Sequence, residues 1–112
     1  MWFKPAAALG DFEQRVMLGV LRLGDEAYGA AIRQEIAARS GRDVSINAIY
    51  TTLDRLERKG FLRSSVGEPT AQRGGRRRKF YEITAAGSAS LRQAYRTFKA
   101  MTAGFERQLG TK

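Results

Sequence analysis

The side chains of this sequence that could do chemistry are mainly cationic. Between Arg55 and Lys79, nine basic residues stand against two acidic ones, so this segment holds +7 of the net charge of +9. Positive charge gathered in one region favours an anionic partner, most simply nucleic acid or an acidic membrane surface. A solvated basic loop without a partner is the alternative.

The residue types that most catalytic and metal sites require are missing. The 112 residues include neither Cys nor His, which excludes zinc sites, Cys and His nucleophiles and acid–base catalysis by His. The carboxylates are scattered, so we expect no catalytic residue, no metal site and no cofactor. The length fits one domain, and no apolar run approaches the roughly 18 residues of a membrane span. We therefore expect a cytoplasmic protein that is not an enzyme and has no membrane contact.

The elements that position the cations begin with helices. Apolar spacing predicts three short ones, over residues 11–23, 28–39 and 46–59. Asp11 is the expected N-cap of the first, with Gln14 completing a capping box. Ser45 is a good N-cap for the third helix, and Gly60 stands where a glycine commonly ends one.

The third predicted helix has two contrasting faces. Its apolar stripe consists of Ile46, Ile49, Leu53 and Leu56, spaced by 3, 4 and 3 residues. Its opposite face is small, polar and basic, and consists of Asn47, Ala48, Thr51, Thr52, Arg55, Arg58 and Lys59. The apolar stripe is expected to join a small core, which leaves the polar face exposed.

Beyond Gly60 the alternation of side chains predicts two strands, over residues 61–66 and 79–84. The segment between them is rich in Gly, Pro, Thr, Gln and Arg and cannot form a core. The strands therefore predict a β-hairpin with a long basic loop.

A final helix is predicted over residues 85–109, with Thr84 as its N-cap. It carries a seam of heptad spacing made of Leu91, Tyr95, Phe98, Thr102, Phe105 and Leu109. Such a helix would be about 37 Å long, whereas a compact chain of this length has a radius of gyration of about 13 Å. We therefore expect a dimerisation helix, with packing on its own core as the alternative.

This order of elements is that of a winged helix-turn-helix, so the fold class is mainly α with a small β-hairpin and a C-terminal dimerisation helix. We expect a loosely ordered leader over 1–10, a DNA-binding domain over 11–84 and the dimerisation helix over 85–112. In this arrangement the third helix enters the major groove of DNA. The β-hairpin with its basic loop, called the wing, lies beside it on phosphates or in the minor groove. The recognition-helix candidates are Ser45, Asn47, Ala48, Tyr50, Thr51 and Arg55, and the wing candidates are Arg73, Arg76, Arg77, Arg78 and Lys79.

Two roles stay open at these positions. Tyr50 either contacts DNA or packs beside Leu53 and the first helix. The arginines of the wing either bind DNA or merely solubilise a disordered loop, which Gly74 and Gly75 would permit.

Three segments resemble the PadR family of bacterial transcriptional regulators. They are Ala27-Tyr28-Gly29-Ala30-Ala31-Ile32, the run from Ile49 to Leu62, and the run from Gly74 to Gly87. The sequence departs from the family where Arg77 stands in place of a frequent proline after the wing's Gly-Gly-Arg. It also departs where Thr51 stands in place of the proline of a frequent Leu-Tyr-Pro.

The resemblance implies a homodimer that binds a double-stranded DNA operator, usually as a repressor, sometimes relieved by a small aromatic effector. Trp2 and Phe3 are candidates for lining an effector pocket at the dimer interface, with simple packing as the alternative. A basic RNA-binding module and a winged-helix protein–protein adaptor are the alternative functions.

Overall fold

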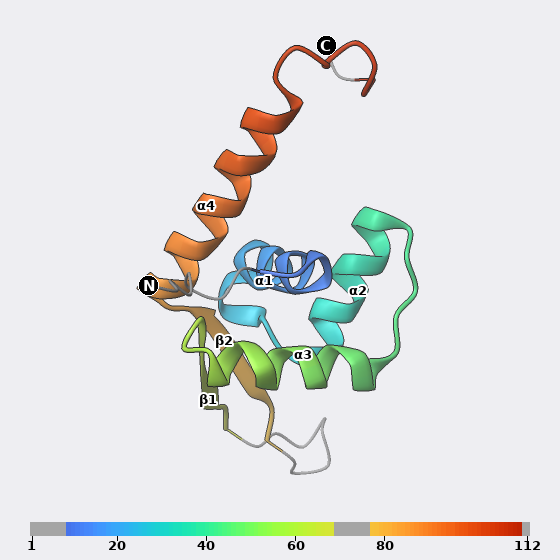
Figure 1. Ribbon diagram of the computed structural model, residues 1–112. Helices are drawn as coiled ribbons and strands as arrows, with labels where there is room; N and C mark the ends of the chain where they lie inside the picture. Colours follow the sequence, from blue (N-terminus) through green and yellow to red (C-terminus); the bar gives the residue numbers. More distant parts are fainter. Residues whose placement is uncertain (1–8, 69–76, 111–112) are drawn as a thin grey trace.

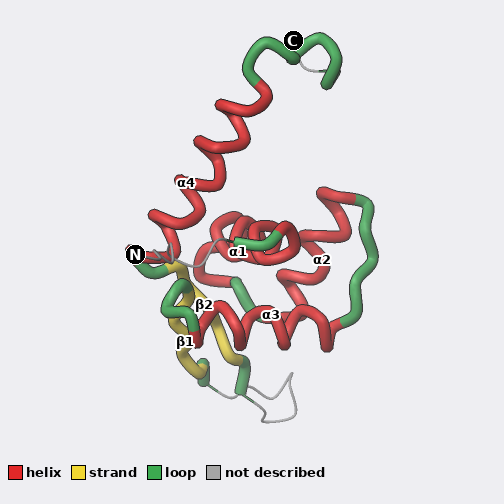
Figure 2. Tube along the Cα trace, viewed as in Figure 1, coloured by secondary structure: helices red, strands yellow, loops and turns green. Residues whose placement is uncertain are grey.

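The computed structural model describes residues 9–68 and 77–110, and the expected leader over 1–10 therefore lies mostly outside the described part. Along the chain it contains helix α1 (Asp11–Leu23), the 3-10 turn η1 (Gly24–Glu26), α2 (Gly29–Ser40), α3 (Ile46–Arg58), strands β1 (Leu62–Val66) and β2 (Lys79–Ile83), and α4 (Ala85–Thr102). Figures 1 and 2 show α1, α2 and α3 packed together, the hairpin beside α3, and α4 leading away from the body. The order is that of a mainly α winged helix-turn-helix.

The core forms where the apolar faces of the first three helices meet. Its largest fully buried side chains are Val16, Met17, Ile32, Ile49, Leu53 and Leu56. Gly19 lets α1 approach α2 closely, because a Cβ at this position would lie 3.3 Å from Cγ2 of Ile32. The stripe predicted on the third helix is confirmed for Ile49, Leu53 and Leu56, which are all buried, while Ile46 is half-buried at the edge of the core.

The start of α1 differs from the sequence prediction. Gly10, not Asp11, is the N-cap, and its N–H donates a hydrogen bond to Oε1 of Glu13 at 2.8 Å. Asp11 lies within the first turn and instead pairs with Arg15 at 2.7 Å. The capping prediction was therefore wrong by one residue.

The hairpin is antiparallel, with Leu62 paired to Ile83 and Ser64 to Tyr81. The link before α2 joins its other edge: the N–H of Tyr81 donates to the carbonyl of Ala27 at 2.9 Å, and Tyr28 forms an isolated bridge with Phe80. The pairing of residues 27 and 28 with β2 fixes the hairpin to the helical body.

The start of α4 is attached to the end of α3 through Thr84. Its hydroxyl donates to the carbonyl of Gly60 at 2.6 Å and accepts the N–H of Gly87 at 3.0 Å, which confirms Thr84 as the N-cap. Gly87 packs directly on the carbonyl of Phe61, where a Cβ would find no room. The first turn of α4 is therefore held rigidly, although the rest of the helix projects.

The end of α4 corrects the sequence prediction. The helix stops at Thr102 rather than at Leu109, and Gly104 follows with φ of +90°. The N–H of Gly104 donates to the carboxylate of Glu106 at 3.1 Å, so the chain turns away from the helix axis here. Even so, the projecting helix gives a radius of gyration of 16.2 Å, larger than the value of about 13 Å for a compact chain of this length.

Candidate nucleic-acid interface

The exposed face of α3 begins at its N-terminus. Ser45 is the N-cap, and its hydroxyl accepts the N–H of Ala48 at 3.0 Å. The side chains that follow on the outward face are mostly uncharged and able to form hydrogen bonds or apolar contacts with bases. Of the predicted recognition residues, Ser45, Asn47, Tyr50, Thr51 and Arg55 are exposed, and Ala48 is half-buried.

Thr52 does not belong to this face. Only 3% of its surface is exposed, so its placement on the polar side of the helix was wrong. It follows Thr51 by one helical step of about 100°, which turns it toward the core.

Tyr50 both packs and remains accessible. It is 47% exposed, yet its ring lies against the backbone of Gly29 at the start of α2, where a Cβ would be 2.6 Å from Cζ and 2.7 Å from the hydroxyl. The sequence left a choice between packing beside Leu53 and contact with DNA. The structure places the ring on α2 and keeps part of it exposed.

The cations of α3 are paired with carboxylates. Arg58 lies 2.9 Å from Asp54 in the same helix. Lys59 donates to Glu13 of α1 at 2.9 Å, and Arg55 lies 3.7 Å from the same carboxylate. The basic character that the sequence gives this helix is therefore largely compensated within the fold.

Glu13 is 6% exposed, and its environment pulls its pKa in two directions. Burial alone would raise the pKa, but hydrogen bonds from Lys59 and from the N–H of Gly10, together with the charges of Lys59 and Arg55, lower it below its ordinary value. Glu13 is thus held ionised between α1 and the C-terminal end of α3.

The base of the wing carries three of the predicted cations. Arg77 is exposed, Arg78 is half-buried, and Lys79 lies 3.6 Å from Glu57. The other two wing candidates, Arg73 and Arg76, lie outside the described residues, as do Trp2 and Phe3.

Arg78 is held by an aromatic pair that sequence reasoning did not single out. Its guanidinium carbon lies 3.9 Å from the ring centroid of Tyr28, a cation–π contact. Tyr28 in turn meets Phe80 edge-to-face, with centroids 5.7 Å apart and an interplanar angle of 76°. The only signal in the sequence was the position of Tyr28 within a family-like segment, because Tyr28 and Arg78 are brought together by the fold.

The burial of Tyr81 completes the inner side of the hairpin. The Tyr81 ring is 6% exposed, and burial, followed by the negative charge of Glu57, raises the pKa of its hydroxyl to about 12. Tyr81 is therefore a core residue and contributes no exposed stacking surface.

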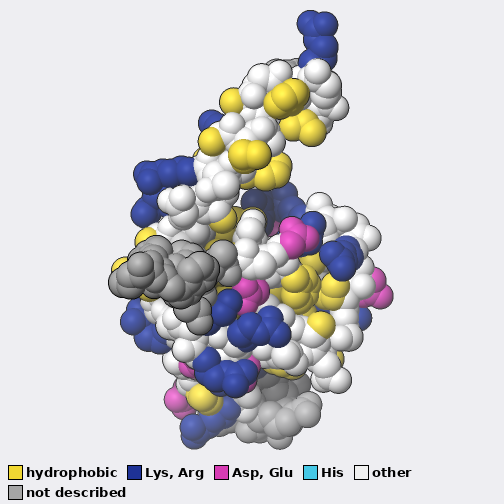
Figure 3. Space-filling view, in the orientation of Figure 1, with side chains coloured by type: hydrophobic (Ala, Val, Ile, Leu, Met, Phe, Trp, Pro, Cys, Tyr) yellow, Lys and Arg dark blue, Asp and Glu magenta, His cyan; other side chains and the backbone are white. Residues whose placement is uncertain are grey.

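The residues of the predicted dimer seam have different surroundings in the structure. Leu91 packs against the core of its own chain, and Thr102 is half-buried at the end of α4. Tyr95 and Phe98 are exposed on the helix, the latter by 68%, while Phe105 and Leu109 are exposed but lie beyond its end. Figure 3 shows hydrophobic side chains along the projecting part of α4.

Met101 extends this apolar face, and an open groove of about 520 Å³ separates α4 from α1. Leu18 and Leu21 of α1 and Leu91, Tyr95 and Phe98 of α4 contribute its apolar lining. Exposed apolar residues on both sides of a groove are typical of an interface with another protein surface.

Within residues 9–68 and 77–110 there is no cluster of three or more His, Cys, Asp or Glu residues that could hold a metal ion. None of the helices in these ranges is long and apolar enough to cross a membrane.

Solved structures support the same architecture. The chain is similar to a PadR family transcriptional regulator from Eggerthella lenta, with 28% identity, a TM-score of 0.61, and coverage of 88% of this chain and 87% of that one. It is also similar to a PadR family regulator from Clostridium difficile, with 27% identity, a TM-score of 0.62, and coverage of 84% and 97%.

A PadR-like transcription factor from Bacteroides fragilis has 25% identity and a TM-score of 0.68, with coverage of 86% of this chain and 87% of that one. No curated protein matches the sequence significantly. The family model described as "Transcriptional regulator PadR-like family" matches residues 17–93, which is well over half of the chain. The chain therefore belongs to the PadR-like family and is a DNA-binding transcriptional regulator rather than an enzyme.

Proposed function

We propose that the protein binds a specific double-stranded DNA operator as a homodimer, with α3 in the major groove and the wing beside it. The observation that carries this proposal is the pairing of an exposed, hydrogen-bonding face on α3 with a cationic hairpin next to it. Asn47 can pair bidentately with adenine, and Thr51 can meet the methyl group of thymine. Figure 1 shows β1 and β2 beside α3, so both elements can reach one stretch of duplex.

Because of the ion pairs, α3 and the wing are expected to contribute differently to DNA binding. Because Arg58 and Lys59 are committed to Asp54 and Glu13, α3 brings little free positive charge to DNA. The wing is then expected to make most of the phosphate contacts. At its base Arg77 is exposed, and Arg78 is held in place by its contact with Tyr28. On this proposal α3 selects the sequence, and Arg73, Arg76, Arg77, Arg78 and Lys79 supply most of the electrostatic affinity.

An RNA-binding module fits these observations less well. Proteins that read single-stranded RNA commonly stack bases on aromatic side chains of an exposed sheet. In the described part of the hairpin, Tyr81 is buried and Phe80 is half-buried against Tyr28. Neither ring provides a stacking platform. A winged-helix adaptor would not need the cationic wing.

The dimer is proposed from the exposed apolar face of α4. Tyr95, Phe98 and Met101 would meet a second copy in the groove between α1 and α4, with residues 11–84 as the DNA-binding part and 85–112 as the dimerisation part. Two recognition helices would then read half-sites with centres about 34–36 Å apart, one turn of DNA, or a small multiple of this distance.

Repression is the mode of regulation that we propose, through occupation of an operator by the dimer in the cytoplasm. The small aromatic effector that the family resemblance implies stays a prediction.

The test is selection of bound duplexes from a random DNA pool, followed by gel-shift titration of the enriched site. We expect a site with two-fold symmetry, and a log–log salt slope of about −5 if about six phosphates are neutralised. Equal affinity for the enriched site and for random duplex at moderate salt would contradict sequence-specific binding. A reporter gene placed behind the enriched site tests repression, because its output should fall when the protein is present.

A further inference from the structure

A second groove, between α1 and α2, lies outside the proposed DNA-binding face and shares only Leu18 and Leu21 with the groove between α1 and α4. Its volume is about 440 Å³, within the range of about 300–1,000 Å³ usual for small-molecule sites. Leu18 and Leu21 of α1 and Ile36 of α2 provide its apolar lining, and Gly19 also lines it. No aromatic ring lines this groove within the described residues, so it offers aliphatic contacts and no stacking partner.

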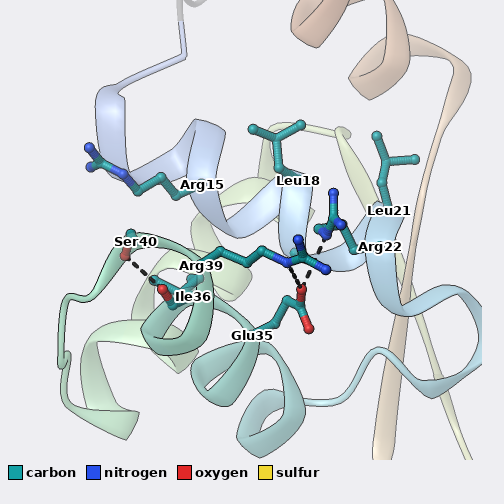
Figure 4. Close-up of a pocket in the computed structure, with 9 residues that line it drawn as sticks. Arg15, Leu18, Leu21, Arg22, Glu35, Ile36, Arg39 and Ser40 are labelled. Carbon is teal, nitrogen blue, oxygen red and sulfur yellow. Dashed lines mark hydrogen bonds and ion pairs between the residues drawn. The ribbon is translucent and has the colours of Figure 1, made fainter. Parts of the chain in front are cut away.

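Two arginines converge at one end of this groove. The Nε atoms of Arg22 and Arg39 both donate to Oε2 of Glu35, at 3.1 and 2.9 Å (Figure 4). The hydrogen bond from Arg39 first, and then that from Arg22, keeps the pKa of Glu35 below its ordinary value, so this carboxylate stays ionised. The cluster carries a net charge of +1.

The same hydrogen bonds leave donors for a ligand. A guanidinium has five N–H donors, and these bonds to Glu35 engage only the Nε donor of each arginine. Both side chains are at least half exposed, so their terminal nitrogens can reach a ligand in the groove. The third arginine, Arg15, is paired with Asp11 at 2.7 Å and points away from Glu35 (Figure 4).

We propose that this groove binds an amphipathic anion, an aliphatic chain that ends in one carboxylate. The chain would lie on Leu18, Leu21 and Ile36, and the carboxylate would accept hydrogen bonds from Arg22 and Arg39. Charge-assisted hydrogen bonds from two guanidinium groups favour a carboxylate over a neutral alcohol of the same length.

Charge disfavours a second copy of α4 as the occupant. The charged residues of α4 are Arg92, Arg96 and Lys99, and the helix has no carboxylate. A helix of this kind would bring like charge to Arg22 and Arg39, whereas an organic anion brings opposite charge. The groove between α1 and α4 has only Arg92 among its charged lining residues and suits the second copy better.

The experiment is a titration of the ¹⁵N-labelled protein with sodium octanoate, followed by the amide signals in ¹H–¹⁵N correlation spectra. We expect saturable shifts in α1 and α2 with a Kd below about 1 mM. Two probes define the chemistry: 1-octanol, which lacks the charge, should bind at least tenfold more weakly, and 3-phenylpropanoate, which has an aromatic body, should also bind more weakly.

Variants locate the site. Arg22→Gln with Arg39→Gln should weaken octanoate binding at least tenfold, whereas the matched pair Arg92→Gln with Arg96→Gln on α4 should leave it unchanged. The proposal is wrong if the first pair binds normally, if the second pair loses binding, or if octanol or 3-phenylpropanoate binds as tightly as octanoate. It is also wrong if the α2 amides shift with protein concentration alone, since a second copy would then fill this groove, whereas the dimer proposed above contacts only α1 and α4. The experiment contains no DNA, so its failure is distinguishable from a failure of operator binding.

Discussion

Tyr50 of α3 rests on Gly29 at the start of α2, where the absence of a side chain makes room for the ring. A Cβ on Gly29 would lie 2.6 Å from Cζ of Tyr50, much closer than such atoms approach in proteins. Because Tyr50 is also 47% exposed, Gly29 sets where an accessible side chain of the proposed DNA-binding face lies.

From this contact we expect Gly29→Ala to change operator affinity more than it changes the free energy of unfolding. Gly29→Ala should push the Tyr50 ring outward, which is inexpensive because the ring is at the far end of a flexible side chain. Gly29 is the first residue of α2, outside the helix interior where a glycine costs about 1 kcal/mol relative to alanine. We expect the free energy of unfolding, measured by urea denaturation, to change by no more than about 1 kcal/mol. Operator affinity, measured by fluorescence anisotropy, should fall about tenfold.

Tyr50→Ala is the matched background for this test. In that background Gly29→Ala should cause no further loss of operator affinity, because no ring remains to be displaced. Additive losses in the double variant would show that Gly29 acts independently of Tyr50.

Substitutions of Asn47 and of Arg77 are expected to weaken DNA binding in different ways. Asn47→Ala should lower affinity by about 1–3 kcal/mol for the selected site, mainly at one base pair, because it would remove the proposed base contact. Arg77→Ala should weaken binding to all duplexes and make the salt slope shallower by about 1, because it would remove the proposed phosphate contact.

Arg63→Ala is the control for charge in the hairpin, since Arg63 is on β1 and is paired with Glu82 at 3.1 Å. It should change the salt slope less than Arg77→Ala does. If Asn47→Ala reduces affinity for every duplex equally, α3 does not read bases.

The ionised carboxylate of Glu13 should make the stability difference between wild type and Glu13→Gln depend on pH. Its pKa is lower in the folded chain than in the unfolded one, so its ionised form stabilises the fold above the unfolded pKa, and this contribution is lost as the pH falls through the folded pKa. Glu13→Gln should therefore lower the free energy of unfolding by about 1–3 kcal/mol at pH 7. The difference from wild type should shrink as the pH falls below the ordinary glutamate pKa of 4.5 and through the lower pKa of folded Glu13.

Denaturant unfolding from pH 7 to pH 3 measures this difference. Glu82→Gln is the control, because Glu82 pairs with Arg63 on an exposed strand and contributes little. If the free energies of unfolding of wild type and Glu13→Gln differ by the same amount from pH 7 to pH 3, the charge of Glu13 is not what stabilises the fold.

Phe98 tests the proposed dimer without disturbing the core. Phe98→Glu puts a charge where the wild-type side chain is 68% exposed, so we expect the thermal midpoint of the subunit to be kept while the protein becomes monomeric in sedimentation equilibrium. Tight operator binding should be lost as well. Leu91 is unsuitable for this test, since it packs against its own core.

Arg96→Glu, on the same helix, is the control for added negative charge and should leave the protein dimeric. A wild-type monomer at tens of micromolar would refute the dimer, and the projecting part of α4 would then need another partner.

Local sequence signals were enough to predict most helices and strands. The 3-4-3 spacing of Ile46, Ile49, Leu53 and Leu56, with Ser45 before it and Gly60 after it, predicted α3 to within one residue at its end. The predicted boundaries of α1 and of both strands differ from the observed ones by one residue at most. These features depend on neighbours along the chain, so the sequence contains them directly.

The end of α4 shows how a local pattern can mislead. Phe105 and Leu109 continue the heptad spacing, but Gly104 lies between them and Thr102 with φ of +90° and stops the helix. Beyond the body of the molecule, no packing in the described chain compensates for a glycine, so its preference for a C-terminal position prevails.

The tertiary structure alone decided how the charged and aromatic side chains of the site are used. Glu13 and Lys59 are 46 residues apart in the chain, yet their ion pair reduces the free charge of α3. The contacts of Tyr28 with Arg78 and of Gly29 with Tyr50 likewise join distant segments. The sequence determines which residue types are present and how they are spaced along each element. Which of them meet depends on how three helices and a hairpin pack around one core, and spacing along the chain does not contain that information.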